Sequence, residues 1–169
     1  MLSRDQMAGK LLRIATRLAT MPSKEGELSV PEGQVIAHLQ KFLSAKYAID
    51  MAYRNFSDRI RGPWRDSLAQ HWYEHADDER KSTYELTMKV IGLGADPMQT
   101  YVQIPACTPN VGAFVQVLMQ MELEAIEAGR ELARLAGENM GLRVLAENTV
   151  VLDTHHLDDL RRWAAKLDA

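Results

Sequence analysis

An acidic residue and a histidine three positions apart, on one face of a helix, are the feature that most constrains the fold of this chain. Asp153 and His156 have this spacing, and Glu79 begins a second instance that ends in Ser82, where a histidine would complete it. Two such helices, with one carboxylate from each of two further helices, hold a pair of metal ions in four-helix bundles. The pattern therefore predicts a helical bundle in which one half of the ligand set has changed.

Glycine and proline divide the chain into the helices that such a bundle needs. The expected helices run from a Ser29–Glu32 capping box to near Gly62, from Pro63 to about Gly94, from a Thr108 cap with Pro109 at the first helical position to near Gly137, and from Gly141 to about Lys166. Residues 95–110 have no clean period and are long enough to cross to the other end of a bundle. No strand pattern is present. The expected fold is all-α: an antiparallel four-helix bundle with one long crossover between helices two and three.

The same internal order occurs in both halves of the chain. Position 46 precedes Glu79 by 33 residues, and Glu122 precedes Asp153 by 31 residues. Two helical hairpins of this kind, related by a pseudo-twofold axis, would bring these residues together at one level of the bundle centre.

Composition excludes several classes of protein. The chain has 169 residues, of which 46% are hydrophobic and 25% charged, with a net charge of −3, so it is expected to be one globular unit without affinity for nucleic acid. A single cysteine, Cys107, excludes an internal disulfide and fits a reducing compartment. No apolar run reaches the roughly 18 residues of a membrane span, and no signal peptide is evident. We therefore expect a soluble, cytoplasmic protein.

Residues 1–21 differ from the rest because they carry four basic residues and one acidic residue. Their apolar side chains have helical spacing: Met7, Leu11, Ile14, Leu18 and Met21. We expect an extra N-terminal amphipathic helix and linker over residues 1–30, followed by the bundle over residues 31–169. Such a helix docks on another subunit or protein, lies on a membrane surface, or packs on its own bundle; we favour docking on a partner.

Three stretches together resemble the ferritin-like superfamily, closest to its bacterioferritin and rubrerythrin branch. His75–Arg80 followed by Leu93–Pro97 is similar to the family's His-Ala-x-Glu-Glu-x-x-His and Leu-Gly-Gly-x-Pro. Glu122–Ala128 resembles the family's third helix, and Asp153–Leu160 its closing Glu-x-x-His-x-x-x-Leu. The resemblance covers about residues 33–166. It implies a four-helix bundle, a di-iron centre and assembly into a homo-oligomer.

Several positions depart from the family pattern. The family's first helix supplies a glutamate seven residues before a tyrosine; Tyr53 is present, but Lys46 stands in the glutamate's place. Ser82 replaces a histidine ligand, and Asp153 is a shorter form of the usual glutamate. Arg80 occupies the position of the haem-binding methionine of bacterioferritins, so we expect no haem.

The remaining ligand set predicts at most one metal ion. Glu79, Glu122, Asp153 and His156 are expected to meet and would suit one Fe, Mn or Zn ion. Alternatively, Lys46 lies among the acids and replaces the metal by an ion-pair network.

Three functional interpretations follow from these residues. The first is a structural or assembly module of a homo-oligomer without ferroxidase activity. The second is a metal-binding protein with a mononuclear or adapted site, in iron storage or oxidant defence. The third is an enzyme that uses an amine or a radical at this site, with Lys46 as the reactive group. We favour the first, because both Lys46 and Ser82 remove ligands.

Two further groups of side chains are noted. His71 and His75, one turn apart, could bind a metal ion, although such a pair is more often a partly exposed helix face. We expect the hydroxyl of Tyr53 to bond to a central carboxylate. The three tryptophans are expected to be packing or interface anchors: Trp64, Trp72 and Trp163.

Overall fold

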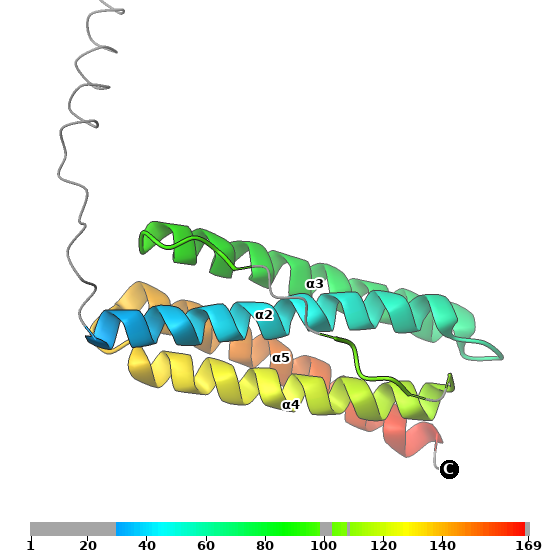
Figure 1. The fold of residues 1–169 in the computed structure, drawn as a ribbon. Coiled ribbons are helices and arrows are strands. Elements are labelled where there is room, and N and C mark those ends of the chain that lie inside the picture. The colour runs from blue at the N-terminus through cyan, green and yellow to red at the C-terminus, as the bar shows by residue number, and fades with distance from the viewer. Residues whose placement is uncertain (1–29, 99–102, 108, 168–169) are drawn as a thin grey trace, which may run out of the picture.

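Two antiparallel helical hairpins pack side by side in the computed structural model, which describes residues 30–98, 103–107 and 109–167 (Figure 1). Helices α2 and α3 form the first hairpin, and α4 and α5 form the second; α2 also packs against α4, and α3 against α5. The helices span Val30–Arg59 (α2), Arg65–Gly92 (α3), Val111–Leu135 (α4) and Met140–Leu167 (α5). The described residues contain no strand, so the predicted all-α four-helix bundle is confirmed.

A long crossover joins the hairpins and makes α3 and α4 run in the same direction (Figure 1). Gln40 of α2 holds it in place. Its Nε2 donates to the backbone oxygen of Asp96 at 2.6 Å, and its Oε1 accepts from the backbone N–H of Met98 at 2.9 Å. One amide side chain can satisfy a carbonyl and an N–H at once, which ties the first half of the crossover to α2.

The helix ends follow the punctuation of the sequence, with one correction. Gly62 and Gly94 have φ of +84° and +77°, the left-handed conformation in which glycine ends a helix without steric cost. The prediction of Thr108 as the cap of α4 was wrong. Asn110 is the cap: it is extended, and its side-chain oxygen accepts from the N–H of Ala113 at 2.8 Å. Pro109 therefore precedes the helix and does not begin it.

Aromatic side chains join the two hairpins. The rings of Phe56 on α2 and Phe114 on α4 stack with centroids 4.4 Å apart, and both are buried. Trp72 is fully buried, whereas Trp64 and Trp163 meet edge to face, with centroids 5.8 Å apart, at an end of the bundle. The expectation that the tryptophans act in packing is thus met for these contacts.

The expected N-terminal helix over residues 1–21 lies outside the residues whose structure is described, and so does Ser29 of the expected Ser29–Glu32 capping box. None of the helices in the described part of the chain is both long enough and apolar enough to cross a bilayer.

Candidate functional site at the bundle centre

Five charged or ionisable side chains meet in the bundle interior, and they come from all four helices. Lys46 lies on α2, Glu79 on α3, Glu122 on α4, and Asp153 and His156 on α5. All five side chains are fully or almost fully buried. Carboxylate and imidazole ligand atoms of the four predicted metal ligands all lie within 4.8 Å of one another. The structure therefore brings together the residues that sequence spacing placed at one level.

Lys46 lies among the acids. Its ammonium group makes buried ion pairs with Glu79 Oε2 and with Asp153 Oδ1. Burial alone would lower the pKa of Lys46, but the negative charges of Glu79, Asp153 and Glu122 outweigh it and raise the pKa above its ordinary value. A protonated amine has no lone pair, so Lys46 is neither a metal ligand nor a nucleophile in this arrangement.

His156 is the second cation of the cluster. Its Nδ1 lies 3.0 Å from Glu79 Oε1 and 3.3 Å from Glu122 Oε1. Burial opposes the charged imidazolium, but hydrogen bonds to Glu122 and Glu79 raise the pKa of His156 to about 9. The ring is therefore protonated at neutral pH and donates its Nδ1–H to these carboxylates.

The acids share these two positive charges and one neutral donor. Tyr53 Oη donates to Glu122 Oε1 at 2.8 Å, as the sequence predicted. Burial raises the pKa of Glu122, as does the nearby charge of Glu79, against the hydrogen bond from His156. Burial also raises the pKa of Asp153, to about 7, although Lys46 opposes the rise. The raised pKa values of Glu122 and Asp153 reduce the total negative charge of the three acids. Together with the two cations, the cluster is close to neutral, as a buried group of charges must be.

Ser82 and Arg80 do not take part in this cluster. The Ser82 hydroxyl donates back into its own helix, to the backbone oxygen of Asp78 at 3.2 Å. Arg80 is exposed, with its Nε 3.8 Å from Asp50 Oδ2. Neither residue replaces the ligand that the family pattern has lost.

The donor set does not fit a pair of metal ions, because the Lys46 ammonium already engages Glu79 and Asp153. Four buried ligand atoms nevertheless have no hydrogen-bond partner among the described residues. Glu79 Oε2 is in an ion pair with Lys46, and the other three are Glu122 Oε2, Asp153 Oδ2 and His156 Nε2. A single divalent ion would suit them in kind. Its binding would require His156 to lose a proton, since a metal ligand must offer a lone pair.

A second group lies on the outer side of this cluster. His71 and His75 of α3 meet Asp159 of α5, and their ligand atoms are close enough for one ion. The ring of His75 separates the two groups: its centroid is 4.1 Å from that of His156, and it stacks on Tyr53 at 5.3 Å. The sequence indicated the histidine pair but missed Asp159. The spacing could have indicated Asp159, because a residue one turn after His156 lies on the face of α5 that was already assigned to the interior.

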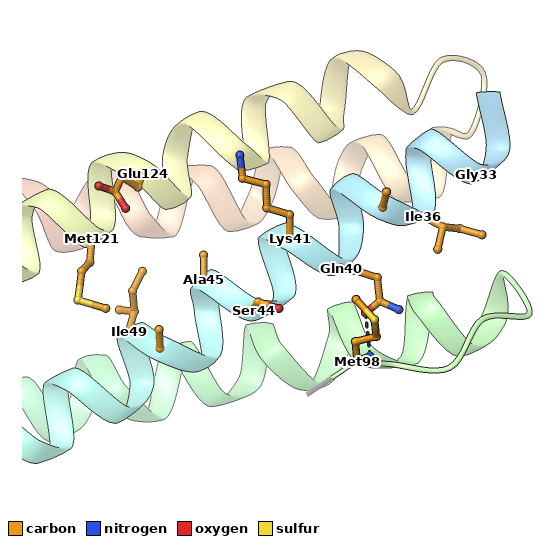
Figure 2. Close-up of a pocket in the computed structure, with 12 residues that line it drawn as sticks. Gly33, Ile36, Gln40, Lys41, Ser44, Ala45, Ile49, Met98, Met121 and Glu124 are labelled. Atoms are coloured by element: carbon orange, nitrogen blue, oxygen red, sulfur yellow. Dashed lines mark hydrogen bonds between the residues drawn. The ribbon is translucent and has the colours of Figure 1, made fainter. Parts of the chain in front are cut away.

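An apolar groove of about 630 Å³ was not predicted; it runs along α2 on the bundle surface (Figure 2). Figure 2 shows Met98 of the crossover beside Gln40, and Met121 and Glu124 of α4 farther along α2. The remaining lining residues come from α2: Gly33, Ile36, Ala37, Gln40, Lys41, Ser44, Ala45, Ala48 and Ile49. Large exposed apolar surfaces of this kind often mark sites where a protein binds another molecule.

The fold and the buried acids define a four-helix bundle of the carboxylate type. The chain belongs to the ferritin-like family: the family model for the ferritin-like domain matches residues 36–169. A crystal structure of "ferritin like, diiron-carboxylate proteins" from Bacillus anthracis str. Ames superposes with a TM-score of 0.77 at 22% sequence identity. The match covers 80% of this chain and 99% of the other. No curated protein gives a significant match.

Proposed function

We propose that the protein is a structural or assembly module: a ferritin-like bundle that forms a homo-oligomer and has no ferroxidase activity. One observation supports this most strongly. The ammonium of Lys46 makes ion pairs with Glu79 and Asp153 at the position where the family supplies a glutamate ligand. The module keeps the acids of a metal centre and neutralises them with side chains of its own.

The chemistry of iron oxidation explains why this substitution matters. Ferroxidase activity needs two irons held close together by carboxylates and imidazoles, so that oxygen takes electrons from both. Here one ligand position carries a cation and another carries Ser82, whose hydroxyl is used within α3. A cation at the centre repels incoming metal ions. The bundle is then stable without iron, which suits a protein whose role is assembly.

The groove along α2 supports self-association. Its lining is mainly apolar, with Lys41 on α2 and Glu124 on α4 both lining it (Figure 2). In a twofold interface the same patch is used by both copies, and this patch carries one basic and one acidic side chain besides its apolar residues. The amphipathic segment 1–21 provides a second contact in this proposal, with another subunit or another protein, in the cytoplasm.

A metal-binding function is the second candidate, and the three unpaired atoms of Glu122, Asp153 and His156 favour it. In that case one ion of iron, manganese or zinc would displace the proton of His156. Such a protein would handle iron or protect against oxidants with a mononuclear site.

The metal content of the central cluster separates the two candidates. All proteins would carry His71→Gln and Asp159→Asn, so that the outer histidine cluster does not contribute. After anaerobic iron loading and elemental analysis, we expect essentially no iron in this background. Adding Lys46→Glu with Ser82→His should restore two irons per chain. One stoichiometric ion that disappears with His156→Ala would instead establish the mononuclear site and overturn the structural proposal.

A further inference from the structure

The cluster of His71, His75 and Asp159 has the geometry of a metal site. The Nε2 atoms of the two histidines lie 3.0 Å apart. Asp159 Oδ2 lies 3.3 Å from His71 Nε2 and 3.5 Å from His75 Nε2. Three ligand atoms from two helices thus form a small triangle.

The size of this triangle matches tetrahedral coordination. Zinc binds imidazole nitrogen at about 2.0–2.1 Å and carboxylate oxygen at about 2.0–2.2 Å, so two ligands at a tetrahedral angle lie about 3.3–3.5 Å apart. The three observed separations fall at or near this range. An ion would therefore fit between the side chains with only small shifts of their ends, and without movement of α3 or α5.

The surroundings of the three side chains hold them in a ligand-ready state. Arg162 makes an ion pair with Asp159 Oδ1, which leaves Oδ2 facing the histidines. Glu74 Oε2 lies 3.8 Å from His71 Nδ1, where it favours a proton on Nδ1 and a lone pair on Nε2. Neutral imidazole is the form that binds metal ions.

The cluster is also accessible, unlike the central acids. The side chain of His71 is 35% exposed and that of Asp159 is 23% exposed, whereas His75 is 8% exposed and forms the inner wall. Water can enter from the outer side and complete the coordination. Two imidazoles, one carboxylate and a water are a ligand set of catalytic zinc sites, and the same set also accepts iron(II).

We propose that His71, His75 and Asp159 bind one divalent transition-metal ion, zinc in preference to iron(II), at a surface site separate from the bundle centre. This site does not use Lys46 or the central acids. It therefore stands whether or not the proposal of a metal-free centre is correct. Zinc is preferred because N/O sites bind it more tightly than iron(II).

Zinc binding to the full-length, chelator-treated protein tests this proposal. Titration against a chromophoric chelator should give one tightly bound zinc per chain, and substitution with Co²⁺ should give the visible absorption of a tetrahedral ion. His71→Gln and Asp159→Asn should each weaken binding by more than about tenfold, since even outer partners of a ligand contribute that much. Both residues are partly exposed, so these variants should fold. His155→Gln, which changes an exposed histidine on α5, should have no effect.

Four outcomes would overturn the proposal. The first is a wild-type protein that binds no zinc. The second is tight binding that persists in the His71→Gln, Asp159→Asn double variant, because the ion would then lie elsewhere. The third is an equal loss in His155→Gln, which would indicate nonspecific binding. The fourth is tighter binding of iron(II) than of zinc in a parallel anaerobic titration, which would contradict the assignment of the metal.

Discussion

At the scale of single residues, Lys46 decides what the bundle centre can do. Its ammonium group lies between the carboxylates of Glu79 and Asp153. An ion pair of this kind is a weak source of net stability, because desolvation of the ions offsets their attraction. Its removal is different, because the acids would then be buried without compensation. Lys46 is thus required for stability as long as the buried acids are present, even if a wholly apolar centre would be as stable.

Lys46→Met should therefore destabilise the metal-free protein by about 3–5 kcal/mol. The loss should be larger at pH 8 than at pH 5, because Asp153, whose pKa burial raises to about 7, is protonated at the lower pH. Urea denaturation at the two pH values would measure it. Lys81→Met, at an exposed position on α3, should change stability by less than about 0.5 kcal/mol. Equal effects of the two substitutions would contradict the central role of Lys46.

His156 gives the protein a specific dependence on pH. Its pKa is about 9 in the folded chain, against 6.5 as the ordinary value, so the folded state holds this proton more tightly. The resulting stability is complete below pH 6.5 and is lost as the pH rises through 9. Glu79 and Glu122 face the ring, with Asp78 at 4.0 Å and the neutral ring of His75 beside it.

The comparison of wild type with His156→Gln isolates this contribution. Between pH 6 and pH 10, the stability difference between the two metal-free proteins should shrink by roughly 3 kcal/mol. Urea denaturation in the presence of a chelator would measure it. A difference that stays constant over this range would mean that His156 is not the proton donor to Glu79 and Glu122.

At the scale of elements, the helix ends show how far sequence patterns can predict the structure. Glycine and proline marked the helices to within a few residues, because these residues act on the local backbone. The start of α4 was misplaced because Thr108 and Asn110, on either side of Pro109, are both good caps. Which one caps the helix depends on the path by which the crossover arrives.

The contact between α4, α2 and α5 at Gly129 depends on the absence of a side chain. A Cβ at this position would lie 2.5 Å from Val150 Cγ2 and 2.9 Å from Phe42 Cζ. Gly129→Ala should lower stability by about 1–2 kcal/mol, since a steric cost of about 1–3 kcal/mol exceeds the gain in helix propensity. Thermal unfolding followed by circular dichroism would measure it.

Gly92→Ala is the matched control for this substitution. Gly92 also lies in a helix, but nothing is within 4 Å of the Cβ that alanine would add. Its melting temperature should be unchanged or higher, because alanine restricts the unfolded chain. If both variants gained stability, the tight packing at Gly129 would be refuted.

At the scale of the whole molecule, the arrangement of hairpins leaves an apolar groove along α2 (Figure 2). A glutamate in this groove would lose its hydration if two copies met there, and removing a charge from water costs several kcal/mol even when it is paired. Ala37→Glu should therefore shift the mass in solution toward the monomer, as measured by light scattering on a sizing column. Ala37 is exposed in the single chain, so the substitution should not unfold it.

Ala165→Glu, at an exposed position on α5 outside the groove, should leave the mass unchanged. A monomeric wild-type protein at micromolar concentration would contradict the assembly role. A wild-type oligomer that Ala37→Glu does not affect would place the interface elsewhere. Deletion of residues 1–24 in the same assay tests the expected N-terminal contact independently.

The sequence by itself determined the class of fold and the content of the central site. Helical periodicity, punctuation and the acid–x–x–His spacing are local properties, and they were enough to bring Glu79, Glu122 and Asp153 to one level. The role of Lys46 could also be inferred from the sequence, because a cation buried among three acids neutralises their charge.

Only the tertiary structure decided which atoms pair and which remain free. Asp159 joins His71 and His75 because α3 and α5 pack with a particular rotation, which no spacing within one helix specifies. The same holds for the groove along α2, which exists because the crossover, held by Gln40, covers only part of that helix. Contacts between distant segments depend on how whole elements pack, and local sequence patterns carry little information about that packing.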